Sequence, residues 1–122
     1  MVATGVTVVA VASGTSFLAP LAKPDVVTTY KTSPVNIFPL SNDVDPKNGK
    51  LTLTQVQAPS YGSIKIFESS YVVYTPQLYW AGTLVMNYTV SNEKLSAYSN
   101  ITVHVKVYYF FYSRTILLSQ LA

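Results

Sequence analysis

Apolar and polar residues alternate with a period of two along much of the chain between residues 24 and 107. The alternation is clearest in two segments. Even positions are apolar from 84 to 90, and odd positions are apolar from 101 to 107. This pattern is typical of strands that bury one face and expose the other, as antiparallel sheets commonly do. Both segments are therefore predicted to be β-strands.

Five further segments are rich in β-forming residues and are separated by turn residues. They cover residues 25–31, 35–38, 51–54, 63–67 and 71–75. The alternation slips after Thr54, which predicts a β-bulge near Gln55. Residues 40–50 read as a polar loop with the turn pair Asn48-Gly49. Because neither sheet could bury its apolar face alone, about seven short strands predict an all-β, antiparallel β-sandwich over residues 23–107.

The composition agrees with a packed core and narrows the classes of function. Of the 122 residues, 49% are hydrophobic and only 11% are charged, which is the reverse of a disordered chain. The chain has no cysteine, so disulfides, thiolate metal sites and cysteine nucleophiles are excluded. The formal net charge is +3, but the basic residues are scattered and form no phosphate-tracking stripe. Nucleic-acid binding is not supported.

The two ends differ from the middle. Residues 1–22 carry no charged side chain and read as the last strand of a preceding repeat, a secretory leader or an unstructured leader. Residues 108–122 form an apolar tail that opens with five aromatic residues, Tyr108, Tyr109, Phe110, Phe111 and Tyr112. The tail is too short for a membrane span. These aromatics are interface candidates, either as a strand extension or as an anchor at a membrane surface.

Six short motifs occur in one order and register over residues 24–107: Asn42-Asp43-Val44-Asp45-Pro46, Leu51-Thr52-Leu53, Tyr61-Gly62-Ser63-Ile64, Val73-Tyr74-Thr75-Pro76, Trp80-Ala81-Gly82-Thr83 and Tyr88-Thr89-Val90-Ser91. In this arrangement the chain resembles the cadherin-like, VCBS-type bacterial immunoglobulin-like tandem repeats. The resemblance implies an immunoglobulin-like or cadherin-like sandwich in an extracellular or cell-surface protein. It also implies roles in spacing and adhesion, sometimes with calcium, and neighbouring repeats or copies of the same chain as partners.

Asn42, Asp43 and Asp45 form the only oxygen-rich cluster and are the candidate metal ligands. Calcium needs six to eight oxygen ligands, usually with several carboxylates. Two lysines, Lys47 and Lys50, stand in the loop where the family commonly has further acidic residues, and they would repel a cation. The alternative is that Asn42 and Asp43 hydrogen-bond the loop backbone in Asx-type turns. A Ca²⁺ cofactor and this structural role both remain open at this stage.

No pattern of residues indicates an enzyme. His104, the only histidine, falls on the outward phase of its strand, and no nucleophile-elbow or nucleotide-binding motif accompanies it. Asn87 and Asn100 begin glycosylation sequons, and their strand phase points outward. Both are glycosylation candidates if the protein is secreted by a eukaryotic host.

We therefore predict a non-catalytic structural or adhesion repeat module of a surface protein. Two other functions compete with this one. The first is a carbohydrate-binding module in which Tyr61, Tyr79 and Trp80 form an aromatic platform for a cell-surface glycan. The second is a filament subunit whose aromatic tail is donated as a strand to a neighbour.

Overall fold

The alternating segments form the predicted strands. A computed structural model describes residues 16–107, so the expectations for residues 1–15 and for the aromatic tail lie outside the described part. The strands are β1 (Asp25–Tyr30), β2 (Val35–Ile37), β3 (Thr52–Val56), β4 (Gly62–Phe67), β5 (Tyr71–Pro76), β6 (Gly82–Ser91) and β7 (Ser96–Lys106).

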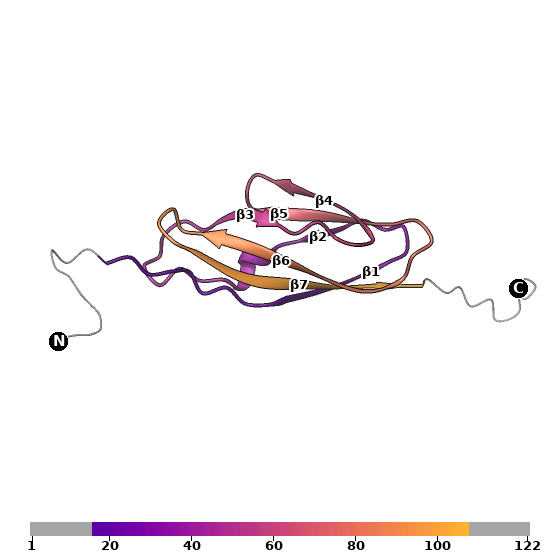
Figure 1. The fold of residues 1–122 in the computed structure, drawn as a ribbon, viewed down its shortest axis with the longest axis horizontal. Coiled ribbons are helices and arrows are strands. Elements are labelled where there is room, and N and C mark those ends of the chain that lie inside the picture. Colours follow the sequence, from indigo (N-terminus) through magenta and orange to yellow (C-terminus); the bar gives the residue numbers. More distant parts are fainter. Residues whose placement is uncertain (1–15, 108–122) are drawn as a thin grey trace, which may run out of the picture.

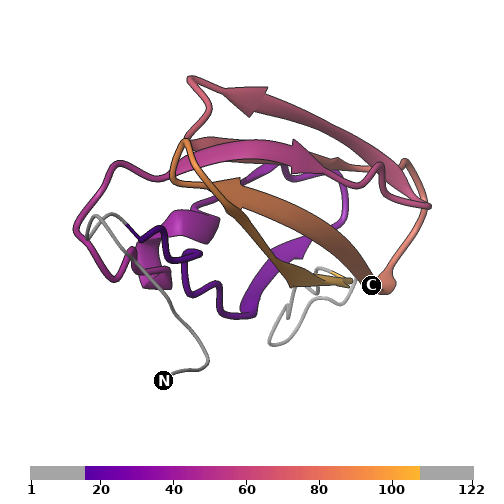
Figure 2. The same ribbon diagram turned by 60° about the vertical axis from the view of Figure 1, so that its left-hand side comes forward.

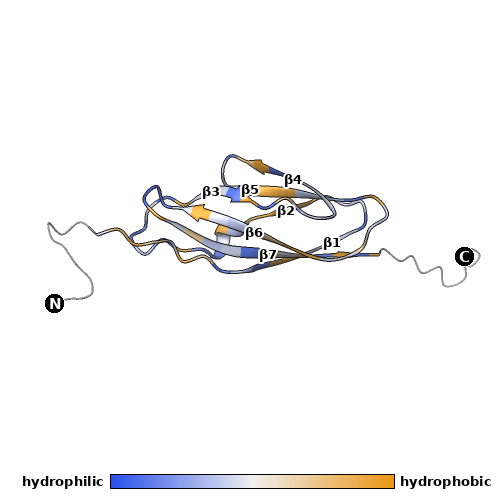
Figure 3. Cartoon of the chain, viewed as in Figure 1, coloured by the Kyte–Doolittle hydropathy of each residue, from blue (hydrophilic) through white to orange (hydrophobic). Residues whose placement is uncertain are grey.

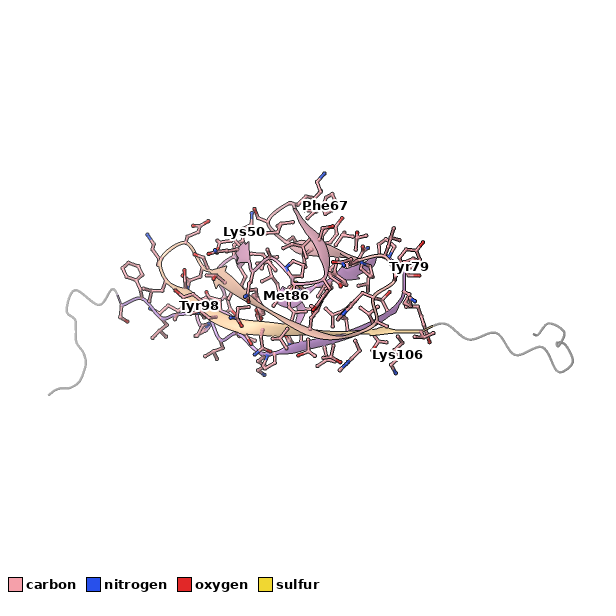
Figure 4. All side chains as sticks on the ribbon, turned by 45° about the vertical axis from the view of Figure 1, so that its right-hand side comes forward. Lys50, Phe67, Tyr79, Met86, Tyr98 and Lys106 are labelled. Carbon is pink, nitrogen blue, oxygen red and sulfur yellow. The ribbon has the colours of Figure 1, made fainter. Side chains whose placement is uncertain are left out.

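The strands build two sheets that lie on each other as separate layers (Figure 2). One sheet has the order β1-β7-β6-β3 and the other has the order β2-β5-β4. The inward residues of both sheets form one core, in which Met86 of β6 is fully buried (Figure 4). The predicted phase of β6 and β7 is confirmed, because their even and odd positions respectively are the buried ones as far as Val105. The sandwich fold is therefore confirmed.

One strand pair departs from the expected antiparallel arrangement. β1 runs parallel to β7, with six residue pairs from Asp25↔Ile101 to Tyr30↔Lys106. The backbone N–H of Lys31 extends this ladder by donating to the Lys106 carbonyl at 2.9 Å. Side-chain alternation reports which face of a strand is buried but not the direction of its neighbour, so the sequence pattern could not reveal this pair.

Local details both confirm and correct the sequence-based expectations. The predicted bulge is present, since the β3–β6 register shifts between Leu53 and Gln55. The loop after β2 is not wholly irregular, because Pro39–Asn42 form a short 3-10 helix whose first turn holds the proline. Val107 was expected to point inward but is 43% exposed, because β7 ends one residue before it.

The strand directions give the sandwich two distinct ends (Figure 1). We call one end the N-pole; it comprises residues 16–24, 38–51, 68–70 and 92–95. The other end, the C-pole, comprises residues 31–34, 57–61, 77–81 and Val107. The described chain arrives at the N-pole and leaves β7 at the C-pole. Tyr79 and Lys106 mark the second end in Figure 4.

Candidate functional site

Two buried aspartates organise the N-pole. Asp43 is 8% exposed and Asp45 is 7% exposed. The Oδ1 atom of Asp43 accepts from the backbone N–H of Lys23 at 2.9 Å, and its Oδ2 atom accepts from the Tyr88 hydroxyl at 2.7 Å. Asp43 thus connects the segment before β1 to the middle of β6. Burial without these donors would be costly for a carboxylate.

Asp45 connects a second set of segments. Its Oδ1 accepts from the Asn92 side-chain amide at 2.8 Å, and its Oδ2 accepts from the backbone N–H of Gly49. The same Asn92 amide donates to the Leu18 carbonyl at 2.7 Å, and its Oδ1 accepts from the N–H groups of residues 94 and 95. Asp45 and Asn92 therefore hold together the loop after β2, the turn between β6 and β7, and residues 16–24, which we call the lead-in segment.

The predicted metal ligands are all engaged in hydrogen bonds within the chain. Asn42 donates its amide to the Pro24 carbonyl at 3.0 Å, while all four carboxylate oxygens of Asp43 and Asp45 accept hydrogen bonds from the chain itself. Asn42 and Asp43 bind the backbone of residues 23 and 24 rather than their own loop. Over residues 16–107 no group of three or more acidic, histidine or cysteine side chains could hold a metal ion. Calcium binding stays a prediction.

Sequence reasoning missed a third carboxylate beside this cluster. Asp25 starts β1, and among the described residues its buried Oδ2 has no hydrogen-bond partner. Burial, followed by the neighbouring Asp43 carboxylate, raises the pKa of Asp25 to about 6, although the Tyr88 hydroxyl acts in the opposite direction. The pKa of Tyr88 is also raised, first by burial and then by Asp43. The inward phase of Tyr88 was the available signal, because a buried phenol needs a hydrogen-bond partner.

The aromatic residues at the C-pole form a stack rather than an open platform. The Tyr61 and Trp80 rings lie 4.6 Å apart at 9°, so Tyr61 covers one face of the half-buried Trp80. Trp80 also packs on Gly82, where an added Cβ would lie 2.9 Å from its Cζ2 atom. Tyr79, by contrast, is 88% exposed and has a φ of 65°.

A second aromatic row crosses the outer face of the three-stranded sheet, and the sequence did not suggest it. Tyr71 lies between Phe38 and Phe67, with ring centroids 5.2 and 5.3 Å away. The Lys65 ammonium lies 5.3 Å from the Phe67 ring centre. At these separations the rings stack on one another. The cross-strand pair Phe67↔Tyr71 explains the row.

His104 and the two sequon asparagines lie on the outer face of the four-stranded sheet, as their phase predicted. The Nδ1 atom of His104 is 2.9 Å from the Thr83 hydroxyl. Asn87 is exposed and Asn100 is half-buried, and the two are direct partners in the β6–β7 ladder. Glycosylation stays a prediction. A surface hollow of about 430 Å³ near Asn87 contains no charged group; it is lined by Gln55, Val56, Gln57, Ala58, Asn87 and Thr89.

The two-layer architecture places the chain among immunoglobulin-like β-sandwiches. The sequence profile of the bacterial Ig domain family matches residues 18–105, and the chain belongs to this family. Domains of this family are typically non-catalytic and are typically found in surface proteins. In residues 16–107, no helix is long and apolar enough to cross a membrane.

Solved structures similar to this chain include two endo-fucoidan hydrolases of glycoside hydrolase family 107. MfFcnA4 matches with a TM-score of 0.54 and 16% identity over 83% of this chain and 16% of the enzyme. MfFcnA9 matches with a TM-score of 0.53 and 17% identity over 81% of this chain and 18% of the enzyme. These likenesses support the fold alone. Among curated proteins, none matches this chain.

Proposed function

We propose that this chain is a non-catalytic spacer module of an extracellular or cell-surface protein, and that it resists tension along its long axis. The observation that carries the proposal is the pairing of β1 with β7. These two strands lie side by side, but the described chain reaches β1 from the N-pole and leaves β7 at the C-pole. A pull on the two ends therefore acts along both strands.

The direction of pull decides how the ladder breaks. Tension between residues 16 and 107 moves β1 and β7 past each other, so all six residue pairs are loaded together. If β1 and β7 were instead both pulled at the same pole, the residue pairs would open one after another. The core adds to the resistance, because Val103 and Val105 of β7 are buried against the opposite sheet.

Single-molecule force spectroscopy tests this proposal. The chain has no cysteine, so Ser16→Cys with Val107→Cys gives two unique attachment points. The matched control is Ser16→Cys with Lys94→Cys, which pulls β1 and β7 from the same pole. We expect a several-fold higher unfolding force for the first pair. Equal forces, or a lower force for the 16–107 pair, would contradict the proposal.

Carbohydrate binding is the competing function, and the C-pole supports it only in part. Tyr79 is exposed, but Tyr61 covers one face of Trp80 and so reduces the flat surface that a sugar ring would need. Binding of soluble polysaccharides that is lost in Tyr79→Ala but retained in Tyr98→Ala would favour this function. Tyr98 is the matched control because it is 74% exposed on the outer face of the four-stranded sheet.

A further inference from the structure

The N-pole exposes a cluster of large apolar side chains, which we call the N-pole patch. Its members are each between 41% and 56% exposed: Phe17, Leu18, Leu21, Val44 and Leu95. Figure 3 shows hydrophobic residues where the described chain first approaches the sandwich. Isolated exposed apolar residues are ordinary on protein surfaces, whereas a contiguous group marks an interaction site.

Hydrogen bonds and a ring contact connect the segments that carry them. Leu21 and Val44 exchange two backbone hydrogen bonds, of 2.7 and 3.1 Å. Asn92 joins the Leu18 carbonyl to the turn that carries Leu95. The Lys94 ammonium lies 5.2 Å from the centre of the Phe17 ring. The patch is thus built on a hydrogen-bonded framework, and its residues are held together without being covered.

The N-pole segments are also rich in lysines. Four of the eight basic residues of the chain, Lys23, Lys47, Lys50 and Lys94, lie in N-pole segments and are exposed, against the exposed acids Glu68 and Glu93. An ammonium group attracts the face of an aromatic ring, as the Lys94–Phe17 contact already illustrates. The surroundings therefore favour an apolar occupant that is rich in aromatic rings and carries no positive charge where it contacts the patch.

The sequence of the same chain supplies such a segment. Residues 108–112 are five consecutive aromatics without a charge, and they follow Val107 at the C-pole. Five residues reach at most about 17 Å, whereas the eleven residues of β7 separate the two poles by about 35 Å. The aromatic segment therefore cannot reach the N-pole patch of its own domain. A second copy is needed.

We propose that residues 108–112 of one copy dock on the N-pole patch of the next copy, so that modules associate end to end. This inference names the partner of the spacer proposed above and rests on it. The contact joins two different surfaces, so a pair of copies still has one free patch on one copy and one free tail on the other. Repetition of such a contact extends the assembly beyond a dimer, into open chains or closed rings.

Sedimentation velocity of the full chain over a range of concentrations tests this docking. The patch variant carries Phe17→Ser and Leu21→Ser, and the tail variant carries Phe110→Ser and Phe111→Ser. The control variant carries Leu78→Ser and Val85→Ser, which are 63% and 54% exposed outside the patch. We expect concentration-dependent oligomers for the wild type and the control, and association weakened about tenfold or more in the patch and tail variants.

A mixture of the two defective variants gives the sharper test. The patch variant retains a tail and the tail variant retains a patch, so together they should form a one-to-one dimer that grows no further. A wild type that stays monomeric, or a mixture that forms no dimer, would overturn the inference. Thermal melting confirms that every variant is folded before it is compared.

A membrane is the alternative partner for an apolar patch on a lysine-rich end of the domain. Co-sedimentation with phosphatidylserine vesicles separates the two partners. Vesicle binding that is lost in the patch variant but kept in the tail variant, without self-association of the wild type, would assign the patch to lipid and overturn the docking inference. The force measurement on single molecules does not depend on either result, so its failure is distinguishable.

Discussion

The hydroxyl of Tyr88, in the middle of β6, donates to the Oδ2 atom of Asp43 at 2.7 Å and lies 3.0 Å from the carbonyl oxygen of Lys23. Tyr88 is 1% exposed and Asp43 is 8% exposed, so water does not replace either partner easily. One phenol therefore holds the lead-in segment and the loop after β2 against the four-stranded sheet.

Removal of this hydroxyl should destabilise the fold. In Tyr88→Phe the ring still fills the core, but the buried Oδ2 of Asp43 loses its donor, which costs about 1–3 kcal/mol. Urea denaturation would show the loss as a lower midpoint with an unchanged slope. Tyr98→Phe is the control, since Tyr98 is 74% exposed. Equal midpoints for the two variants would contradict the role given to Tyr88.

Stability should fall as the pH rises from about 4 to about 6 because of Asp25. Its pKa is about 6 in the folded chain, above the ordinary 3.8, so the folded state binds more protons than the unfolded state within this window. The unfolding free energy then decreases with increasing pH. Chemical denaturation at a series of pH values measures this slope.

The matched variant for this prediction is Asp25→Asn, which cannot ionise. It should flatten the decline between these pH values and should be more stable than the wild type at pH 7. A wild-type stability that rises through the window, or an unchanged slope in the variant, would refute the assignment to Asp25.

A side chain at Gly62 should destabilise the fold. Its φ is 127°, and an added Cβ would lie 2.3 Å from the backbone carbonyl oxygen of Thr75 in the paired strand. Gly62→Ala should therefore lower the unfolding free energy by about 1–3 kcal/mol, because backbone rather than a flexible side chain must move. Thermal melting against Ser63→Ala, an exposed neighbour, measures the effect. Similar melting temperatures would argue against the strain.

Calcium should have little effect on thermal stability. Each carboxylate oxygen of Asp43 and Asp45 already accepts a hydrogen bond within the chain, so a cation would have to displace existing donors. We expect equal melting temperatures in calcium and in chelator, to within about one degree. A rise of several degrees with calcium, absent in Asp45→Asn, would instead establish the metal site.

The sequence pattern predicted the strands because a strand that buries one face carries an apolar residue at every second position. It did not predict the first five residues of β7, where Ser96, Tyr98 and Asn100 follow no clear apolar alternation. These residues are strand because β6 extends far enough to pair with them, as Ser91↔Ser96 illustrates. Pairing partners of this kind are a property of the fold rather than of the segment.

The candidate site was predictable only in its acidic half. Asp43 and Asp45 stand out in a polar loop, but Tyr88 and Asn92 lie more than forty positions away, and their sequence does not show that their side chains reach the loop. The N-pole patch was equally hidden, because its members come from three separated segments. Apolar residues in a sequence predict burial by default, and only the structure can identify those that remain exposed.

The parallel pairing of β1 with β7 also determines the point in synthesis at which the four-stranded sheet can form. β1 lies at the edge of its sheet and its only strand partner there is β7, although the two stand near opposite ends of the described sequence. Of the strands in residues 16–107, β1 is synthesised first and β7 last, so β1 has no strand partner until β7 has emerged from the ribosome. Distant partners of this kind slow folding and prolong the time for which the backbone edge of β1 stays unpaired and open to association with other chains.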